Sequence, residues 1–271
     1  LDVFYNKYLN KYLLTNYKLT KKIKIKKNKS IFVEGFISHP EYLIYNILIA
    51  KILSEIKNQN IKVLLRKGDI QSTKIFQSYK IKDFIYINDG SLISRLMAFI
   101  KAVFILKDVN NFKKLLRIKY DGIDIGKCLY EQYLRFDKKP HIYSIEPVYY
   151  IYLMKLLIYN EQFKKIYKHQ NNTFLVQSET QYLPFRLSRQ RAMLNNMQIV
   201  SRSGRKNIMI KFYRNIKEIY EGRAKLTPEL FNKITRKIKN KIKGKYYKSK
   251  IKKKIKLTIG LDEYQKNIMS K

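Results

Sequence analysis

The chain of 271 residues is 45% hydrophobic and carries 58 lysines and arginines against 20 aspartates and glutamates, a formal net charge of +38. Its hydrophobic content is typical of globular proteins and excludes a wholly disordered chain. A single cysteine, Cys128, excludes an internal disulfide, three scattered histidines predict no metal site, and no apolar run reaches the roughly 20 residues of a membrane-spanning helix.

The first ordered part of the chain predicts a strand, a helix and a second strand. Residues 1–30 are rich in tyrosine and lysine and predict a basic N-terminal segment with a surface helix. Ser38 followed by Glu41 is a helix-start signature in which Ser38 caps the helix. The expected elements of this unit are Ile31–Ile37, Tyr42–Ile56 and Ile61–Leu65. A unit of this length predicts a right-handed parallel crossover.

Short apolar runs and amphipathic segments continue to alternate along the chain. The further expected helices are Gln71–Tyr79, Ser91–Leu106, Asn110–Ile118, Ile145–His169 and Pro184–Asn195, and the further strands are Asp83–Ile87, Thr173–Gln177 and Gln198–Ser201. This alternation predicts an α/β fold with a Rossmann-like parallel sheet, helices on both faces and the 31–37 strand near the centre. We expect one domain over 31–244, whose last helix begins near Thr227, and a lysine-rich tail or the start of an interdomain linker over 245–271.

Candidate binding residues follow the expected strands, because ligands of open parallel sheets lie beyond the carboxyl ends of the strands. No glycine-rich phosphate loop follows the first strand, so the sequence predicts no dinucleotide or ATP bound there. The polar segments expected at this edge are the one at His39, the glycine-bearing loop Asp121–Gly126 and the segment Tyr182–Arg186. We expect these three segments, far apart in the sequence, to line one cleft.

Each candidate has a structural and a functional interpretation. His39 either bonds the backbone at a helix start or contacts an acceptor molecule. Asp121 and Asp124 are either turn formers and helix caps, or one of them is the base that deprotonates a sugar hydroxyl. Arg186 and Arg189 share a helix face and either are solvated or recognise a phosphate or carboxylate. The remaining candidates for acceptor binding are Gly122, Gly126 and Tyr182.

The segment 121–140 resembles one in bacterial capsule and surface-polysaccharide glycosyltransferases that have two nucleotide-binding-type domains, the GT-B architecture. It consists of an acidic, glycine-bearing loop, a helix with Leu129 and Tyr133 at helical spacing, and Pro140 at the exit. The segments that share the resemblance, in the order of the family, are Ile31–Lys67, Ser78–Ile87, 121–140 and 173–200. The resemblance therefore covers about residues 31–235.

The resemblance implies the amino-terminal, acceptor-side part of an enzyme that transfers a sugar from a nucleotide sugar to a saccharide or lipid-linked saccharide. It implies no metal ion and no cofactor besides the nucleotide-sugar substrate, and it makes Asp121 or Asp124 the catalytic base. The chain departs from the family at Pro184–Phe185, where a glycine is usual, and in lacking the donor-binding domain. Leu1 in place of Met predicts a reading frame that is cut.

The basic excess has two interpretations. It consists mostly of lysine and accompanies many isoleucines, asparagines and tyrosines, a bias that an AT-rich genome imposes on any protein through its codons. Alternatively, it indicates a basic RNA-binding or ribosome-associated protein. Under the glycosyltransferase interpretation nucleic acid is not a partner, and the protein is cytoplasmic, with basic faces that contact the anionic inner face of the cell membrane.

Overall fold

The computed structural model describes residues 2–19, 27–136, 145–168, 172–178, 182–203, 209–215 and 218. All of them fall in one compact unit of the chain, Leu1–Ile219. The helix expected near Thr227 and the lysine-rich segment 245–271 lie outside the described residues.

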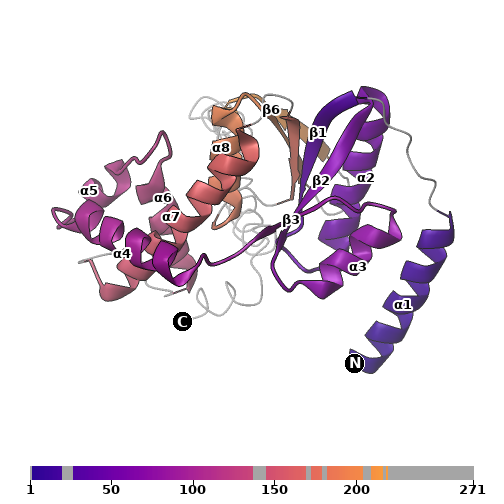
Figure 1. Cartoon of the computed structure of the whole chain (residues 1–271), viewed down its shortest axis with the longest axis horizontal. Coiled ribbons are helices and arrows are strands. Elements are labelled where there is room, and N and C mark those ends of the chain that lie inside the picture. Colours follow the sequence, from indigo (N-terminus) through magenta and orange to yellow (C-terminus); the bar gives the residue numbers. More distant parts are fainter. Residues whose placement is uncertain are drawn as a thin grey trace, which may run out of the picture. The chain divides into compact units, whose positions relative to one another are not determined.

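In the described part of the chain, six strands form one sheet (Figure 1). They are β1 (Lys27–Glu34), β2 (Gln59–Arg66), β3 (Phe84–Ile87), β4 (Asn172–Gln177), β5 (Gln198–Ser203) and β6 (Met209–Tyr213). The strand order is β3-β2-β1-β4-β5-β6, and all neighbours pair in parallel except β5 and β6. This is a Rossmann-like α/β sheet with β1 in its interior, as the alternating pattern predicts.

The antiparallel strand β6 was not predicted, and it makes the sheet mixed instead of wholly parallel. Ile199 pairs with Tyr213 and Ser203 with Met209. The connection between Ser203 and Met209 is far shorter than the dozen or more residues that a parallel crossover requires. The chain therefore returns beside β5 in the opposite direction.

Eight helices are described, and they follow the predicted ones closely except for α1, which the sequence placed only loosely. They are α1 (Asp2–Leu19), α2 (Pro40–Lys57), α3 (Ile70–Ser78), α4 (Leu92–Leu106), α5 (Phe112–Arg117), α6 (Ile125–Phe136), α7 (Pro147–Tyr167) and α8 (Phe185–Leu194). The N-terminal segment is part of the packed domain, since α1 packs against α3 and Asn16 Nδ2 donates to Ser78 Oγ at 3.0 Å.

The first strand and helix differ from the prediction at their shared boundary. β1 ends at Glu34, and Gly35 runs so close to β2 that a Cβ there would lie 2.5 Å from Leu65 Cδ2. His39 is the N-cap of α2 and makes no side-chain capping bond. The predicted cap, Ser38, instead donates to Asp69 Oδ2 at 2.7 Å. The Ser38 hydroxyl therefore binds the carboxylate of Asp69, which follows β2, and does not cap α2 as the local sequence pattern predicted.

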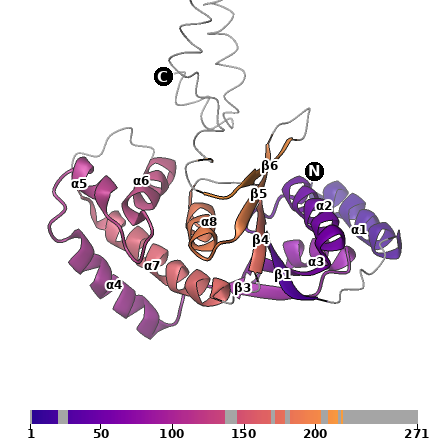
Figure 2. The ribbon, with the colours of Figure 1, turned by 90° about the horizontal axis from the view of Figure 1, so that it is seen from above.

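The strands alternate between two hydrophobic cores because successive side chains point to opposite faces of a sheet. Phe32 and Leu64 belong to the core under α7 and α8, whereas Val33 and Val63 belong to the core under α2 and α3. Figure 2 shows α2 and α3 on one side of the sheet and α7 and α8 on the other. Helices cover both faces, as predicted.

Candidate functional site

A cavity of about 750 Å³ opens where β2 and β3 end. Its wall combines the residues that follow these two strands with side chains of α6 and α7 and the segment before α8. The carboxyl edge of a parallel sheet is where such folds bind ligands, and the volume is within the roughly 300–1,000 Å³ common for small-molecule sites. The polar side chains used below are Arg66, Lys67, Asp89, Arg95, Gln132, Tyr152, Lys155 and Tyr159.

The loop after β3 is held in one conformation at the cavity rim. Gln162 brackets the backbone of Asn88: its Oε1 accepts from Asn88 N at 3.1 Å and its Nε2 donates to Asn88 O at 2.8 Å. The side chain of Asn88 in turn accepts from Gly90 N at 2.8 Å, and Gly90 has φ +77°. Ser91 then caps α4 by accepting from Ser94 N at 3.2 Å. The hydrogen bonds that shape this rim all lie within the protein, so the rim is preorganised.

Cations dominate the charge of the cavity wall. Among the described residues of the wall, four are basic (Arg66, Lys67, Arg95 and Lys155) and one, Asp89, is a carboxylate. Asp89 Oδ1 accepts from Tyr159 Oη at 2.8 Å, and Arg95 Nε donates to Asp89 O at 3.0 Å. Burial, followed by the neighbouring Asp89, raises the pKa of Tyr159 to about 12. Tyr159 therefore stays a neutral donor at physiological pH, and the wall attracts anionic groups.

Gln132, on α6, contributes to the cavity wall. Its Oε1 is buried and has no hydrogen-bond partner among the described residues. An unsatisfied buried acceptor costs about 1–3 kcal/mol. This oxygen is closed to solvent, so a ligand in the cavity would reach it only if the Gln132 side chain turned.

Asp121 lies in an ion-paired cluster away from this cavity. Its carboxylate accepts from Arg191 and lies 2.9 Å from Lys164 Nζ. The hydrogen bond from Lys164, reinforced by that from Arg191, holds the pKa of Asp121 below its ordinary value. Arg191 is itself buried and donates to Asn160 Oδ1 at 2.7 Å. A carboxylate paired in this way is a weaker base than a free one.

The rest of the Asp121–Gly126 loop also packs on α8. Asp124 N donates to Gln190 Oε1 at 2.9 Å, while the Asp124 carboxylate forms looser pairs with Lys127 at 3.4 Å and Lys119 at 3.9 Å. A Cβ on Gly122 would lie 3.2 Å from Leu194, the last residue of α8. The loop therefore packs against the buried helix α8 and helps to hold it in position.

Gly126 allows α6 to start against α5. A Cβ at Gly126 would lie 1.8 Å from the carbonyl oxygen of Leu115, and Gly126 N donates to Ile118 O at 3.0 Å. Only a residue without a side chain fits such a contact. Gly126 was a candidate for acceptor binding, and its surroundings give it a packing role.

The candidate arginines of α8 are buried. Arg189 is 1% exposed and Arg186 4% exposed, so neither is part of a solvated helix face. Arg186 forms an ion pair with Glu131 of α6, which also accepts from Tyr182 N at 3.4 Å. Arg135 stacks over the Tyr182 ring, 4.4 Å from its centre. Of the described residues in this segment, Leu183 and Pro184 line the cavity.

His39 lies at the carboxyl end of β1, exposed and in edge contact with the Tyr42 ring. Nearby, Asn46 links the ends of β1 and β4 by donating to Glu34 O at 3.1 Å and accepting from Ser178 Oγ at 2.7 Å. His39 thus lies at the expected edge, although it does not line the 750 Å³ cavity.

The three predicted segments do not meet in one cleft. Asp121 and Gly122 contact Arg191 and Leu194 in the last turn of α8, which leads into the amino end of β5. His39 follows the carboxyl end of β1, and α8 is about 15 Å long. Neither His39 nor the Asp121–Gly126 loop lines the 750 Å³ cavity, so the three segments do not share it.

The sequence contains a signal for part of the cavity that the candidate list missed. Arg66-Lys67-Gly68-Asp69 and Asn88-Asp89-Gly90-Ser91 both follow short apolar strands directly. Each has the polar, glycine-bearing composition of a ligand-binding turn at a carboxyl edge. The contributions of α6 and α7 carry no such signal, because their residues reach the cavity only through tertiary packing.

In the described part of the chain, no group of three or more His, Cys, Asp or Glu side chains lies close enough to hold a metal ion. None of the described helices is long and apolar enough to cross a membrane. Burial raises the pKa of the Cys128 thiol to about 12, so this cysteine is not a ready nucleophile. No family model, curated protein or solved structure matches the chain significantly.

Proposed function

We propose that this chain is the acceptor-binding part of a glycosyltransferase that transfers a sugar from a nucleotide sugar to a saccharide acceptor in surface-polysaccharide biosynthesis. The observation that supports it most directly is the polar, cationic cavity at the carboxyl ends of β2 and β3. The order of segments that resembles the GT-B glycosyltransferases supports the same proposal. The nucleotide sugar would be bound by a second domain, as in those enzymes.

The cavity chemistry suits a saccharide that carries phosphate or carboxylate. Tyr152, Tyr159 and Gln132 offer hydroxyl and amide groups to sugar hydroxyls, and tyrosine rings offer flat apolar surface to sugar rings. Lys155 and Arg95 offer positive charge to an anionic group. A lipid-linked saccharide, whose sugar and lipid are joined through phosphate, has both kinds of group.

Within this proposal Asp89 is the best-placed carboxylate to accept the acceptor proton. It lines the cavity and is positioned by Tyr159, whereas Asp121 is engaged by Arg191 and Lys164. General-base catalysis requires the base within hydrogen-bond reach of the reacting hydroxyl. An acceptor bound in the cavity would lie beside Asp89, which supports this role.

Equilibrium binding of phosphorylated and unphosphorylated oligosaccharides to the whole chain tests the proposal. Lys155→Gln should weaken binding of the phosphorylated forms about tenfold, because it removes one charge-assisted contact. Lys74→Gln, on the exposed side of α3, is the matched control and should leave binding unchanged. Absence of any saccharide binding, with tight RNA binding at physiological salt instead, would overturn the proposal in favour of an RNA-binding protein.

A further inference from the structure

The solvent-facing half of α4 carries mostly large apolar side chains. Leu92 is 82% exposed, Ile93 75% and Phe104 72%, far more than large apolar side chains in a packed helix. The other members of this half, all between 41% and 59% exposed, are Leu96, Met97, Phe99, Ile100 and Val103. These eight residues are called the α4 apolar face below.

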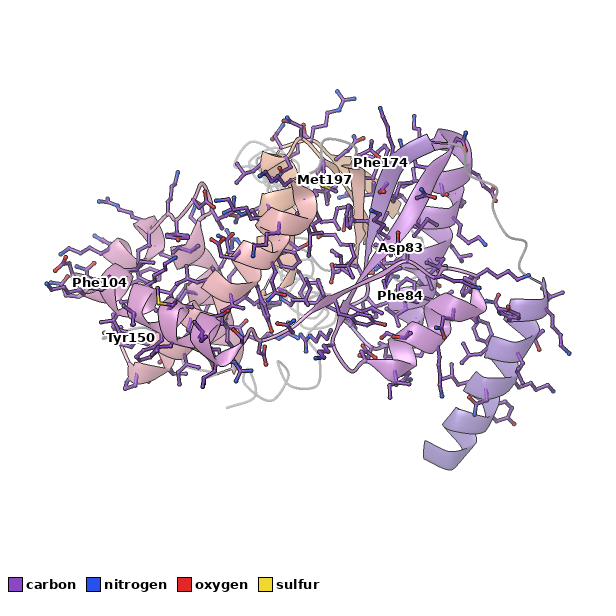
Figure 3. The ribbon with its side chains drawn as sticks, viewed as in Figure 1. Asp83, Phe84, Phe104, Tyr150, Phe174 and Met197 are labelled. Carbon is purple, nitrogen blue, oxygen red and sulfur yellow. The ribbon has the colours of Figure 1, made fainter. Side chains whose placement is uncertain are left out.

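Helical geometry places this face opposite the packing side of α4. The buried residues Ala98, Ala102 and Leu106 follow at intervals of four and form one stripe, and α4 packs against α7. Of the two charged residues of the helix, Arg95 lies on the same side as this stripe and lines the 750 Å³ cavity, whereas Lys101 lies at the margin of the outward half. Figure 2 shows α4 on the far side of α7 from the sheet, and Figure 3 shows Phe104 at the outer margin of these helices.

A surface helix of a soluble domain normally turns polar residues outward. Here the outward half carries the larger side chains and the inward stripe contains two alanines. Apolar area of this extent marks a surface that is covered by a partner. At 15 residues α4 is about 22 Å long, too short to cross a bilayer, so a bilayer would be contacted along the side of the helix.

The charges that follow α4 in the chain select the partner. Five exposed cations follow the helix within thirteen residues: Lys107, Lys113, Lys114, Arg117 and Lys119. Asp108 is the one carboxylate in this stretch. Apolar side chains next to a cluster of basic residues form the combination that binds the interface of anionic membranes. Pairing of two copies through this face would instead bring together two chains of formal net charge +38 each.

We propose that the α4 apolar face docks on an anionic lipid bilayer, with α4 parallel to the membrane plane, its apolar side chains between the headgroups and the basic residues of 107–119 against the lipid phosphates. The inference does not depend on glycosyl transfer, since it rests on α4 and α5 alone. It would bring the rim at Ser91, where α4 begins, next to the bilayer surface. A lipid-linked substrate would then reach the cavity without leaving the membrane.

Vesicle co-sedimentation of the whole chain tests the docking surface. We expect binding to vesicles of equal parts phosphatidylglycerol and phosphatidylcholine, and much weaker binding to phosphatidylcholine alone. The variant Leu96→Ser/Ile100→Ser/Phe104→Ser should bind the anionic vesicles at least about tenfold more weakly. The matched control Leu48→Ser/Ile52→Ser/Ile56→Ser removes three exposed apolar residues of α2 and should bind as the unmodified chain does.

A tryptophan reporter separates insertion from simple charge attraction, because the chain contains no tryptophan. The emission of Phe104→Trp should shift to shorter wavelength on anionic vesicles and be quenched by brominated acyl chains. That of Ile56→Trp on α2 should do neither. Both substitutions replace exposed side chains, so folding is preserved, and circular dichroism verifies it.

Three results would overturn the proposal. One is equal vesicle binding by the α4 variant and the unmodified chain. Another is vesicle binding by Phe104→Trp without a shift of its emission to shorter wavelength. The third is an emission shift that appears without lipid as the protein concentration rises, which would identify a second copy of the chain as the partner. None of these measurements involves a sugar, so their failure is distinguishable from failure of the glycosyltransferase proposal.

Discussion

Asp121 and Arg191 show how, at the residue scale, a polar loop becomes structural. Asp121 has φ +50°, a left-handed conformation in which aspartate and asparagine are tolerated, and its carboxylate compensates a buried guanidinium. Without that carboxylate, Arg191 would keep its bond to Asn160 and lose the nearest negative charge. The loop thereby stabilises the last turn of α8.

Replacement of Asp121 by asparagine should reduce stability in a pH-dependent way. Because pairing lowers the pKa of Asp121 in the folded protein, its stabilisation is present above the unfolded pKa of about 3.9 and is lost as the pH falls through the folded value. Asp121→Asn keeps the backbone conformation and one hydrogen bond, so the expected loss at neutral pH is about 1 kcal/mol. Urea unfolding at neutral and acidic pH measures it.

The control is Asp108→Asn, which changes an exposed carboxylate on the turn after α4. If Asp121 is instead the catalytic base, Asp121→Asn should lower turnover in an active enzyme and leave stability unchanged. Equal unfolding free energies for the variant and the unmodified chain at neutral pH would thus contradict the structural role.

A second substitution tests the close contact between α5 and α6. Gly126→Ala would place a Cβ 1.8 Å from the carbonyl oxygen of Leu115, so the two helices would have to separate. We expect a loss of more than about 3 kcal/mol, typical of severe overpacking. Gly68→Ala, where φ is +88° and no atom lies within 4 Å, should cost only about 1 kcal/mol of backbone strain. Similar losses for both, measured by urea unfolding, would refute the steric explanation.

At the element scale, α8 is a helix with a polar sequence in a buried place. Its arginines have the spacing of a solvated face, and the sequence offers no local sign that they are covered. The partners that make burial tolerable, Glu131 and Asp121, come from segments 55 and 70 residues away. Pairings of this kind depend on the tertiary fold, so local periodicity cannot predict them.

The ion pair between Glu131 and Arg186 should behave as a coupled unit. Glu131→Leu alone leaves a buried guanidinium without its counter-charge and should cost about 3 kcal/mol. Replacing both residues, as Glu131→Leu/Arg186→Met, should cost less than the sum of the two single changes. A complete double-mutant cycle by denaturant unfolding gives the coupling energy, and additive losses would show that the pair does not hold α8 in place.

The elements themselves were largely predictable, for reasons that particular residues make clear. Ser91 with its apolar helix, and the alternating strand 59–66, carry their structure in local spacing. β6 was not predicted because it is a short segment, and its antiparallel pairing with β5 follows from the short connection between the two strands. The cap at Ser38 was wrong because Asp69 competed for the hydroxyl. The sequence predicted that a binding site lies at the carboxyl edge of the sheet, but it did not predict which residues line the cavity. Much of the cavity wall comes from α6 and α7, which local sequence patterns do not place there.

At the scale of the whole molecule, the net charge of +38 sets a background for every binding measurement. If the charge is mainly compositional, RNA binding should lack sequence preference and fall by about a hundredfold or more between roughly 50 and 200 mM salt. Filter binding with unrelated RNA sequences checks both points. One RNA bound selectively at physiological salt would contradict this expectation and support the RNA-binding interpretation.

The strand order has a consequence for how the chain is made. β1 and β2 pair across one short crossover, whereas the pairing of Ser30 with Asn172 joins β1 to a strand synthesised some 140 residues later. During translation β1 would therefore leave the ribosome with one edge paired and the other open until β4 emerges. Pulsed hydrogen exchange during refolding should show protection at Val63 and Leu64 before Leu175 and Val176. Simultaneous protection would mean that the two halves assemble together, whereas a delay would identify the open edge of β1 as the place where a nascent chain is exposed to aggregation and to chaperones.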